Sequence, residues 1–288
     1  MVIALAVSLN LKAQNCTTGA LHRINYVDPT DFDNIHEWNG AIDYQSYDGI
    51  QTILVEDGFT LIISNVTVNM VDNGVIRVEP GGQLIFDNCL IQILSGCDDW
   101  DGISVEGNDG GGLDPLQYTS STPKTLKIGS TDDAAYCQIA NCTIKNVNGS
   151  AVFSTEGGII NIESSTIQNS KIGIKISDYT KHSSKAADEY ENACRIYDVT
   201  ININEIFSTD PYDEFLDHAA IWLEDVSHIV IESCELTNGY ASNTDDDRGY
   251  GIYANNASFG LTQKLTRSVN SGDGGKGEPT LGENNCPT

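Results

Sequence analysis

The chain contains the stretch Val55-Glu56-Asp57-Gly58-Phe59-Thr60-Leu61-Ile62-Ile63-Ser64-Asn65-Val66-Thr67-Val68, and 23 residues further on it contains Val78-Glu79-Pro80-Gly81-Gly82-Gln83-Leu84-Ile85-Phe86-Asp87-Asn88-Cys89-Leu90-Ile91. The two stretches align without a gap, with valine, glutamate, glycine, leucine and asparagine at the same positions. A fixed period of roughly 20 to 50 residues is typical of solenoid proteins. The repeat therefore predicts a fold made of stacked, similar coils.

The asparagine position of this repeat recurs along the chain with apolar residues at fixed places around it. It is occupied by Asn65, Asn88, Asn141, Ser164, Asp198 and Ser233. Apolar residues lie two and four positions before it and three after it, in the alternation that predicts a β-strand with one face inside. The alternation slips by one at the asparagine position, and Asn, Asp and Ser tolerate the left-handed backbone of a tight bend. Each coil is therefore predicted to hold two short strands joined by a corner.

A third strand in each coil has the pattern Gly-Ile-x-Val. Its copies are Gly102–Val105, Gly173–Ile176, Ala220–Leu223 and Gly251–Ala254, with weaker ones at Val75–Val78 and Ser150–Phe153. Three strands in about 23 residues predict an all-β, right-handed parallel β-helix of six to seven rungs, in which equivalent positions stack at about 4.8 Å. A helical bundle is excluded because no long stretch has a period of 3.6 residues.

The composition of the 288 residues limits the partners and suggests the organisation of the chain. The net charge of −26 argues against nucleic-acid binding. Residues 1–14 are expected to be the remnant of a secretory signal peptide, and no segment is apolar enough to span a membrane as a helix. An N-terminal cap is expected at 15–50, the β-helix at 51–262 and a flexible tail or linker at 263–288. The protein is expected to be a monomer.

Five of the eight cysteines fall on inward positions of the repeat. Cys89, Cys142 and Cys234 share one position, and Cys137 and Cys194 share another. Small core residues are the favoured interpretation, although export would permit disulfides. Only Cys89 and Cys142 lie on successive rungs, close enough for a bridge.

Four insertions interrupt the 23-residue spacing, and all of them border the third strand. They start at Gly107, Asp178, Glu205 and Gly239. Loops on a solenoid commonly form its working face. The outward residues of the third strand are expected to be Arg77, Ser104, Val152, Lys175, Trp222 and Tyr253. A cation and two aromatic rings on successive rungs are a plausible floor for a sugar chain, so Lys175, Trp222, Tyr253 and Arg77 are the predicted substrate-binding residues; packing of the rings beneath the loops is the alternative.

The predicted loops are acidic and allow two kinds of chemistry. Asp245, Asp246, Asp247 and Asp217 are candidate ligands for Ca²⁺, which prefers carboxylate oxygens. In a lyase acting on a uronate chain, Arg248 would neutralise the sugar carboxylate, and His218 or Lys175 would take the α-proton. Solvated acidic loops are the simpler interpretation of the same residues.

The runs Val78–Leu84 and Cys97–Gly107, with Asn88-Cys89 between them, resemble secreted right-handed parallel β-helix proteins of the pectin-lyase-like fold, in particular surface proteins of Bacteroidota exported by the type IX system. The likeness covers roughly residues 50–255 and implies a secreted or outer-membrane-surface location. The lyase motifs Gly-His-Gly and Arg-Ile-Lys do not occur in this chain, and Asn243-Thr244-Asp245 matches only one triplet of the polygalacturonases.

Three functions remain open at this point. The favoured expectation is a non-enzymatic surface protein whose loop-walled face binds a polysaccharide or surface glycan, or acts as an adhesin. The alternatives are a calcium-dependent polysaccharide lyase and a structural stalk. The sequence leaves the sugar and the metal unidentified.

Overall fold

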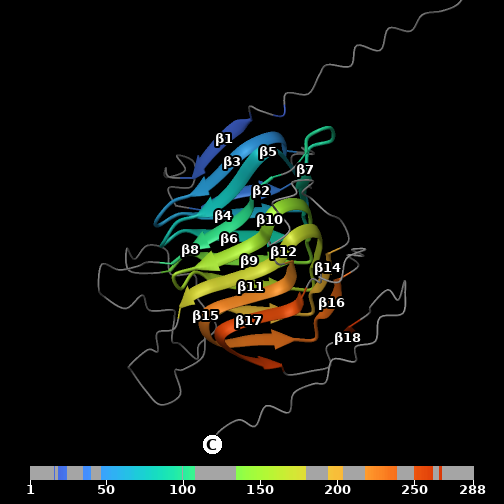
Figure 1. The fold of residues 1–288 in the computed structure, drawn as a ribbon. Coiled ribbons are helices and arrows are strands. Elements are labelled where there is room, and N and C mark those ends of the chain that lie inside the picture. The colour runs from blue at the N-terminus through green and yellow to red at the C-terminus, as the bar shows by residue number, and fades with distance from the viewer. Residues whose placement is uncertain are drawn as a thin grey trace, which may run out of the picture.

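A computed structural model describes residues 16, 19–24, 35–39, 47–98, 100–107, 134–179, 194–203, 218–238, 250–261 and 266–267. These residues form strands joined by short turns, and the strands pair in parallel from one coil to the next. Figure 1 shows the coils stacked in chain order, from blue at one end to red at the other. The parallel β-helix expected from the repeat is confirmed.

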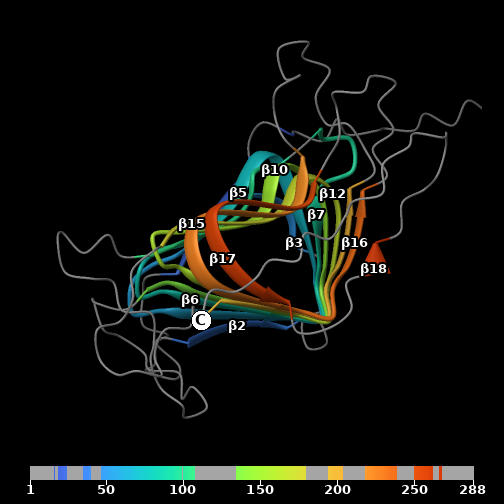
Figure 2. The same ribbon diagram turned by 60° about the horizontal axis from the view of Figure 1, so that its bottom comes forward.

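Each complete coil has three sides, and the view nearly along the stack in Figure 2 shows successive coils lying over one another. The first side precedes the asparagine corner and consists of β2 (Ile35–Asn39), β4 (Thr60–Ser64), β6 (Gln83–Asp87), β9 (Tyr136–Ala140), β11 (Ile159–Glu163) and β13 (Arg195–Tyr197). The second side follows that corner and includes β7 (Leu90–Ile93), β14 (Thr200–Ile203), β16 (Glu235–Asn238) and β18 (Thr266–Arg267). The third side includes β1 (Ala20–Ile24), β3 (Tyr47–Val55) and β8 (Gly102–Glu106).

Several of the described strands bend from one side to the next and tie the sides together. β3, β5 (Thr67–Val78), β10 (Thr143–Thr155) and β12 (Thr166–Tyr179) run from the second side onto the third, whereas β15 (Ala219–Glu232) and β17 (Tyr250–Leu261) run from the third side towards the first. Residues with positive φ occur inside these strands, for example Asn146 in β10 and Asn169 in β12. The predicted third strand is therefore continuous with a neighbouring strand in most coils.

The core consists of columns of equivalent side chains, as the repeat predicts. Parallel pairing brings together the residues two positions before the corner, which are Ile63, Phe86, Ile139, Ile162, Ile196 and Ile231. All six are at most 1% exposed. Burial of such side chains typically contributes about 1.5–3 kcal/mol each, so these columns are the main stabilising element of the fold. Trp100 joins the core, fully buried, and its Nε1 donates a hydrogen bond to the Lys145 carbonyl at 2.9 Å.

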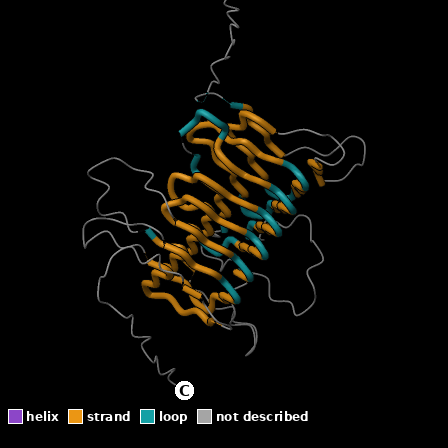
Figure 3. The backbone as a smooth tube through the Cα atoms, turned by 90° about the vertical axis from the view of Figure 1, so that its right-hand side faces the viewer, coloured by secondary structure: helices purple, strands orange, loops and turns teal. Residues whose placement is uncertain are grey.

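The corners repeat the same backbone conformation, and Figure 3 shows short loops recurring between the strands of successive coils. All six residues at the asparagine position have φ between 45° and 57°. Asn88 Nδ2 donates to Asn65 Oδ1 at 2.9 Å, and Ser164 Oγ donates to Asp198 Oδ2 at 3.0 Å. The turn before the first side has its own positive-φ residues, Gly58 and Gly81, both at 79°. The predicted corner is confirmed, and its residue types follow from the left-handed backbone that it requires.

The β-helix extends beyond both expected boundaries. β1 pairs with β3 and β2 pairs with β4, so the segment expected to be a cap at 15–50 already contributes strands to a coil. At the other end β18 pairs with β16, within the expected tail. Cys16 and Cys97 form a disulfide that the sequence did not predict. The expected signal peptide at 1–14 and most of the four insertions lie outside the described residues.

Candidate functional site

The outward column of the third side follows the strand register from Arg77 to Tyr253. Successive partners in the parallel pairing are Arg77, Ser104, Phe153, Lys175, Trp222 and Tyr253. The prediction that Val152 points outward is wrong. Val152 is fully buried and pairs with Ile103 and Ile174, and Phe153 occupies the outward position instead. The cause is a register shift in β10 between Val147 and Ser150, which moves the alternation of this strand by one residue.

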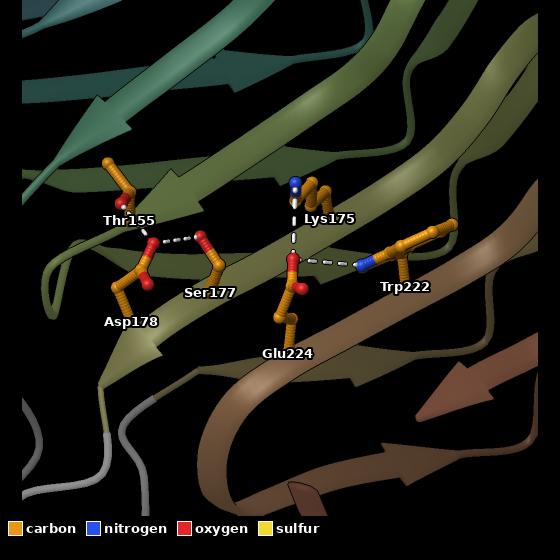
Figure 4. A network of polar contacts seen from close by, with 6 residues as sticks. All are labelled: Thr155, Lys175, Ser177, Asp178, Trp222 and Glu224. Atoms are coloured by element: carbon orange, nitrogen blue, oxygen red, sulfur yellow. Dashed lines mark hydrogen bonds and ion pairs between the residues drawn. The ribbon is translucent and has the colours of Figure 1, made fainter. Parts of the chain in front are cut away.

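Lys175 is the central residue of this column, and its ammonium group contacts three neighbours. Its Nζ lies 5.5 Å from the centroid of the Phe153 ring and 5.6 Å from that of Trp222. Figure 4 shows Glu224 on the next strand reaching both Lys175, at 3.6 Å, and Trp222, whose Nε1 donates to Glu224 Oε2 at 3.3 Å. A carboxylate and two ring faces all attract a cation. The side chain is therefore held in place between its neighbours.

Aromatic rings continue the column beyond Lys175. The centroids of Trp222 and Tyr253 are 4.0 Å apart with an interplanar angle of 31°. Tyr250 meets Tyr253 edge-on at 5.3 Å and is 42% exposed. Because the two faces of Trp222 are turned towards Lys175 and Tyr253, its ring edge is the part that is available to a ligand.

A row of polar side chains lies beside this column, two residues further along each strand. The pairing places Glu106, Thr155, Ser177, Glu224 and Asn255 in one line. Asp178 links members of the line, accepting hydrogen bonds from Ser177 Oγ at 2.7 Å and Thr155 Oγ1 at 3.3 Å (Figure 4). We refer to the column from Phe153 to Tyr253, together with Thr155, Glu224 and Asn255, as the binding strip; Ser177 is buried, with 3% of its surface exposed, and is not part of it.

Arg77 lies in the same column but three coils from Lys175. Its guanidinium forms an ion pair with Glu106, with Nε 2.6 Å from Oε1, and the hydrogen bond to Glu106 raises the pKa of Arg77 above its ordinary value. Arg23 is paired with Glu56 in the same way. The structure therefore brings Lys175, Trp222 and Tyr253 together, whereas Arg77 belongs to a separate ion pair.

The predicted catalytic and metal residues are only partly described. His218 lies immediately before β15 and its carbonyl accepts a hydrogen bond from the Tyr250 amide at 2.6 Å. It is four residues before Trp222, a separation of roughly 13 Å along a strand, and its role as the alternative base to Lys175 stays a prediction. Arg248, Asp245, Asp246, Asp247 and Asp217 lie outside the described residues. Within the described part, the His, Cys, Asp and Glu cluster at Cys16, Asp72 and Cys97 contains two cysteines that are joined in the disulfide.

A hollow lies on the asparagine corner, apart from the binding strip. It has a volume of about 320 Å³. Its lining residues are Asn65, Val66, Thr67, Asn88, Cys89, Leu90, Asn141 and Thr143. The repeat predicted the positions of these residues in the coils. It did not predict the hollow, because the hollow is formed jointly by residues of three successive coils.

Among the described residues, none belongs to a helix long and apolar enough to cross a membrane. Comparisons with protein-family models, with curated proteins and with solved structures found no match for this chain.

Proposed function

We propose that this protein is a rigid surface or secreted scaffold whose binding strip holds an uncharged glycan along the axis of the stack. The carrying observation is the side-by-side arrangement of an aromatic row and a polar row over successive coils. Sugars present apolar C–H surfaces and hydroxyl groups at close intervals, so a ligand of this kind can contact both rows at once. Because the strands fix the rows, little conformational freedom is lost on binding.

The charges beside the strip favour a neutral ligand over a uronate polymer. Lys175, the cation within the strip, already has a carboxylate partner in Glu224 at 3.6 Å. The net charge of the whole chain is −26. An anionic polymer would have to displace the Glu224 carboxylate and approach a protein of like charge. A neutral glycan meets neither penalty.

The test compares two single aromatic substitutions in a glycan-binding assay. Trp222→Ala removes the central ring of the strip, and we expect a loss of at least tenfold in affinity for neutral glucans, mannans or xylans on an array. Tyr197→Ala is the matched control, because Tyr197 is an exposed ring stacked on Arg195 on the first side, away from the strip. An unchanged array profile for Trp222→Ala would overturn the proposal.

A calcium-dependent lyase is the less supported alternative. Its candidate base Lys175 is already engaged by Glu224 at 3.6 Å and by the rings of Phe153 and Trp222, whereas a general base must reach the proton that it removes. Release of unsaturated, ultraviolet-absorbing products from alginate or pectate, lost after chelation and in Lys175→Ala and Arg248→Ala, would establish this activity.

A structural stalk is favoured by one observation, the closure of both Trp222 faces within the column. A stalk would show neither glycan binding nor product release, and Trp222→Ala would then change stability alone. The secreted or outer-membrane-surface location belongs to the proposal and is tested by labelling intact cells with an antibody to this chain. Labelling only after cell lysis would contradict it.

A further inference from the structure

Cys89 and Cys142 occupy equivalent inward positions on neighbouring coils. Each follows the corner asparagine directly, and the next residues, Leu90 and Thr143, are partners in the parallel pairing. The Thr143 amide donates to the Cys89 carbonyl at 2.8 Å. Neighbouring strands lie about 4.8 Å apart, within the roughly 4.4 to 6.8 Å that separates the Cα atoms of a disulfide. No backbone movement is therefore needed to join the two residues.

The two residues are already in contact. The Cys89 amide donates to Cys142 Sγ at 3.3 Å, and the Cys142 thiol itself donates to the Ala140 carbonyl at 3.0 Å. Both residues are buried, with 4% and 2% of their surface exposed. Cys89 also borders the hollow of about 320 Å³ on the asparagine corner, but its thiol faces inward and donates to the carbonyls of Ile63 and Asp87. A reagent therefore reaches this sulfur when the corner opens locally or before the coil has closed.

The other three free thiols of the described chain lack this arrangement. Cys137 and Cys194 share a column, but Ile160 lies between them, because it pairs with Cys137 and its amide contacts Cys194 Sγ at 3.5 Å. Cys234 follows Val199 in the column that contains Cys89. These three thiols have similar burial, from 0% to 2% exposed, so they are internal controls for the chemistry of the pair.

We propose that Cys89 and Cys142 form a redox-active pair that closes to a disulfide between two coils when a small-molecule disulfide is present. The Cys89 thiolate, its proton released to water, attacks one sulfur of the reagent, and the departing thiolate takes up a proton. The Cys142 sulfur then loses its proton and displaces the second half of the reagent from Cys89. Two cysteine thiols are oxidised, and one reagent disulfide is reduced to two thiols.

The environment of the two sulfurs sets the order of these steps. The neighbouring Cys142 thiol lowers the pKa of the Cys89 thiol, because it can donate a hydrogen bond to the Cys89 thiolate. The same hydrogen bond, followed by burial, raises the pKa of Cys142. Cys89, whose thiolate is the more stabilised of the two, is therefore the attacking residue, and Cys142 is the resolving residue.

The experiment uses the full chain and oxidised glutathione as the reagent. The reduced protein is treated either in the native state or during refolding, then denatured, alkylated, digested and analysed by mass spectrometry. We expect the peptides of Cys89 and Cys142 to lose their alkyl labels together and to appear as one linked species, while Cys137, Cys194 and Cys234 keep theirs. A linked peptide in either preparation supports the pair.

The variants use residues that already occur at this inward position on other coils, so that a lost linked peptide does not reflect misfolding. Val66, Ser165 and Val199 occupy the same inward position on other coils, so Cys89→Val and Cys142→Ser are expected to fold. Each should abolish the linked peptide, whereas Cys234→Val should leave it unchanged. Absence of the linked peptide from both preparations of the unsubstituted protein, or a glutathione adduct on Cys89 beside a free Cys142, would overturn the proposal.

Discussion

The corner row, from Asn65 to Ser233, and the binding strip both run along the stack, but they are held in different ways. Every member of the corner row has the same left-handed backbone, and several bond directly to one another. The members of the binding strip share ordinary strand backbone and differ in charge, size and ring content. The corner row is thus a requirement of the main chain, whereas the binding strip is a set of side-chain contacts that the main chain permits.

This difference implies different responses to substitution. A change in the corner row alters the bend on which the neighbouring coils depend, so its effect should be on folding. A change in the binding strip leaves the bend intact, so its effect should be smaller on folding and larger on recognition. The following predictions test that division, from the largest effect on stability to the smallest.

The largest effect is expected for Asn88→Val. Holding a β-branched residue in the left-handed conformation at φ 54° costs about 1–2 kcal/mol, and the lost hydrogen bond to Asn65 adds about 1 kcal/mol. Denaturant unfolding should therefore show a loss of about 2–3 kcal/mol. Asn88→Gly is the control, because glycine accepts this φ and should lose only about 1 kcal/mol. Equal losses in the two variants would contradict the backbone explanation.

Trp222→Ala should destabilise the fold less, by about 1–2 kcal/mol, through the lost ring contact with Tyr253 and the lost cover over Lys175. Thermal or denaturant unfolding measures this loss, and the array described above measures the loss of binding. Tyr197→Ala, at a ring that is 36% exposed, should cost less than half as much. A larger destabilisation than that of Asn88→Val would show that the strip, like the corner, supports the coils.

Glu224→Gln removes the charge that faces Lys175 but keeps an oxygen for the Trp222 N–H group. Lys175 and Glu224 are 27% and 33% exposed, so the ion pair should be worth about 1 kcal/mol or less. The difference between the two proteins should shrink when unfolding is repeated at 1 M salt, because salt screens exposed charges. A difference that grows with salt would rule out an ionic origin.

The smallest effect concerns pH and the first coil, where His22 meets Trp38 edge-on at 5.0 Å. Burial lowers the pKa of His22 below 6.5, so the unfolded chain binds a proton more readily than the folded one. The contribution of His22 to stability is complete above about pH 6.5 and declines as the pH falls through the lowered pKa. His22→Gln should remove this part of the pH dependence between about pH 7 and 5. Identical slopes for the two proteins would contradict the assignment.

Particular residues show how far the sequence could be followed. The column of Ile63, Phe86 and Ile139, the corner asparagines and the burial of five cysteines were all predicted and are confirmed. The outward position of Phe153 was missed because the irregularity near Gly149, whose φ is 129°, shifts the alternation without changing the apolar pattern around it. The disulfide between Cys16 and Cys97 was also missed, since it joins residues 81 apart on segments that lack the repeat.

The sequence by itself determined the architecture, because a parallel β-helix repeats the same demands in every coil. Inward positions must be apolar and corner positions must tolerate positive φ, so the same residue types recur at these positions in coil after coil. Only the tertiary structure decided which side chains meet across coils: the enclosure of Lys175 between two rings, the carboxylate that bridges Lys175 and Trp222, and the contact of Cys89 with Cys142. These contacts depend on the register between strands that are 22 to 53 residues apart in the chain and on the side-chain rotamers. A pattern of residue types reveals neither.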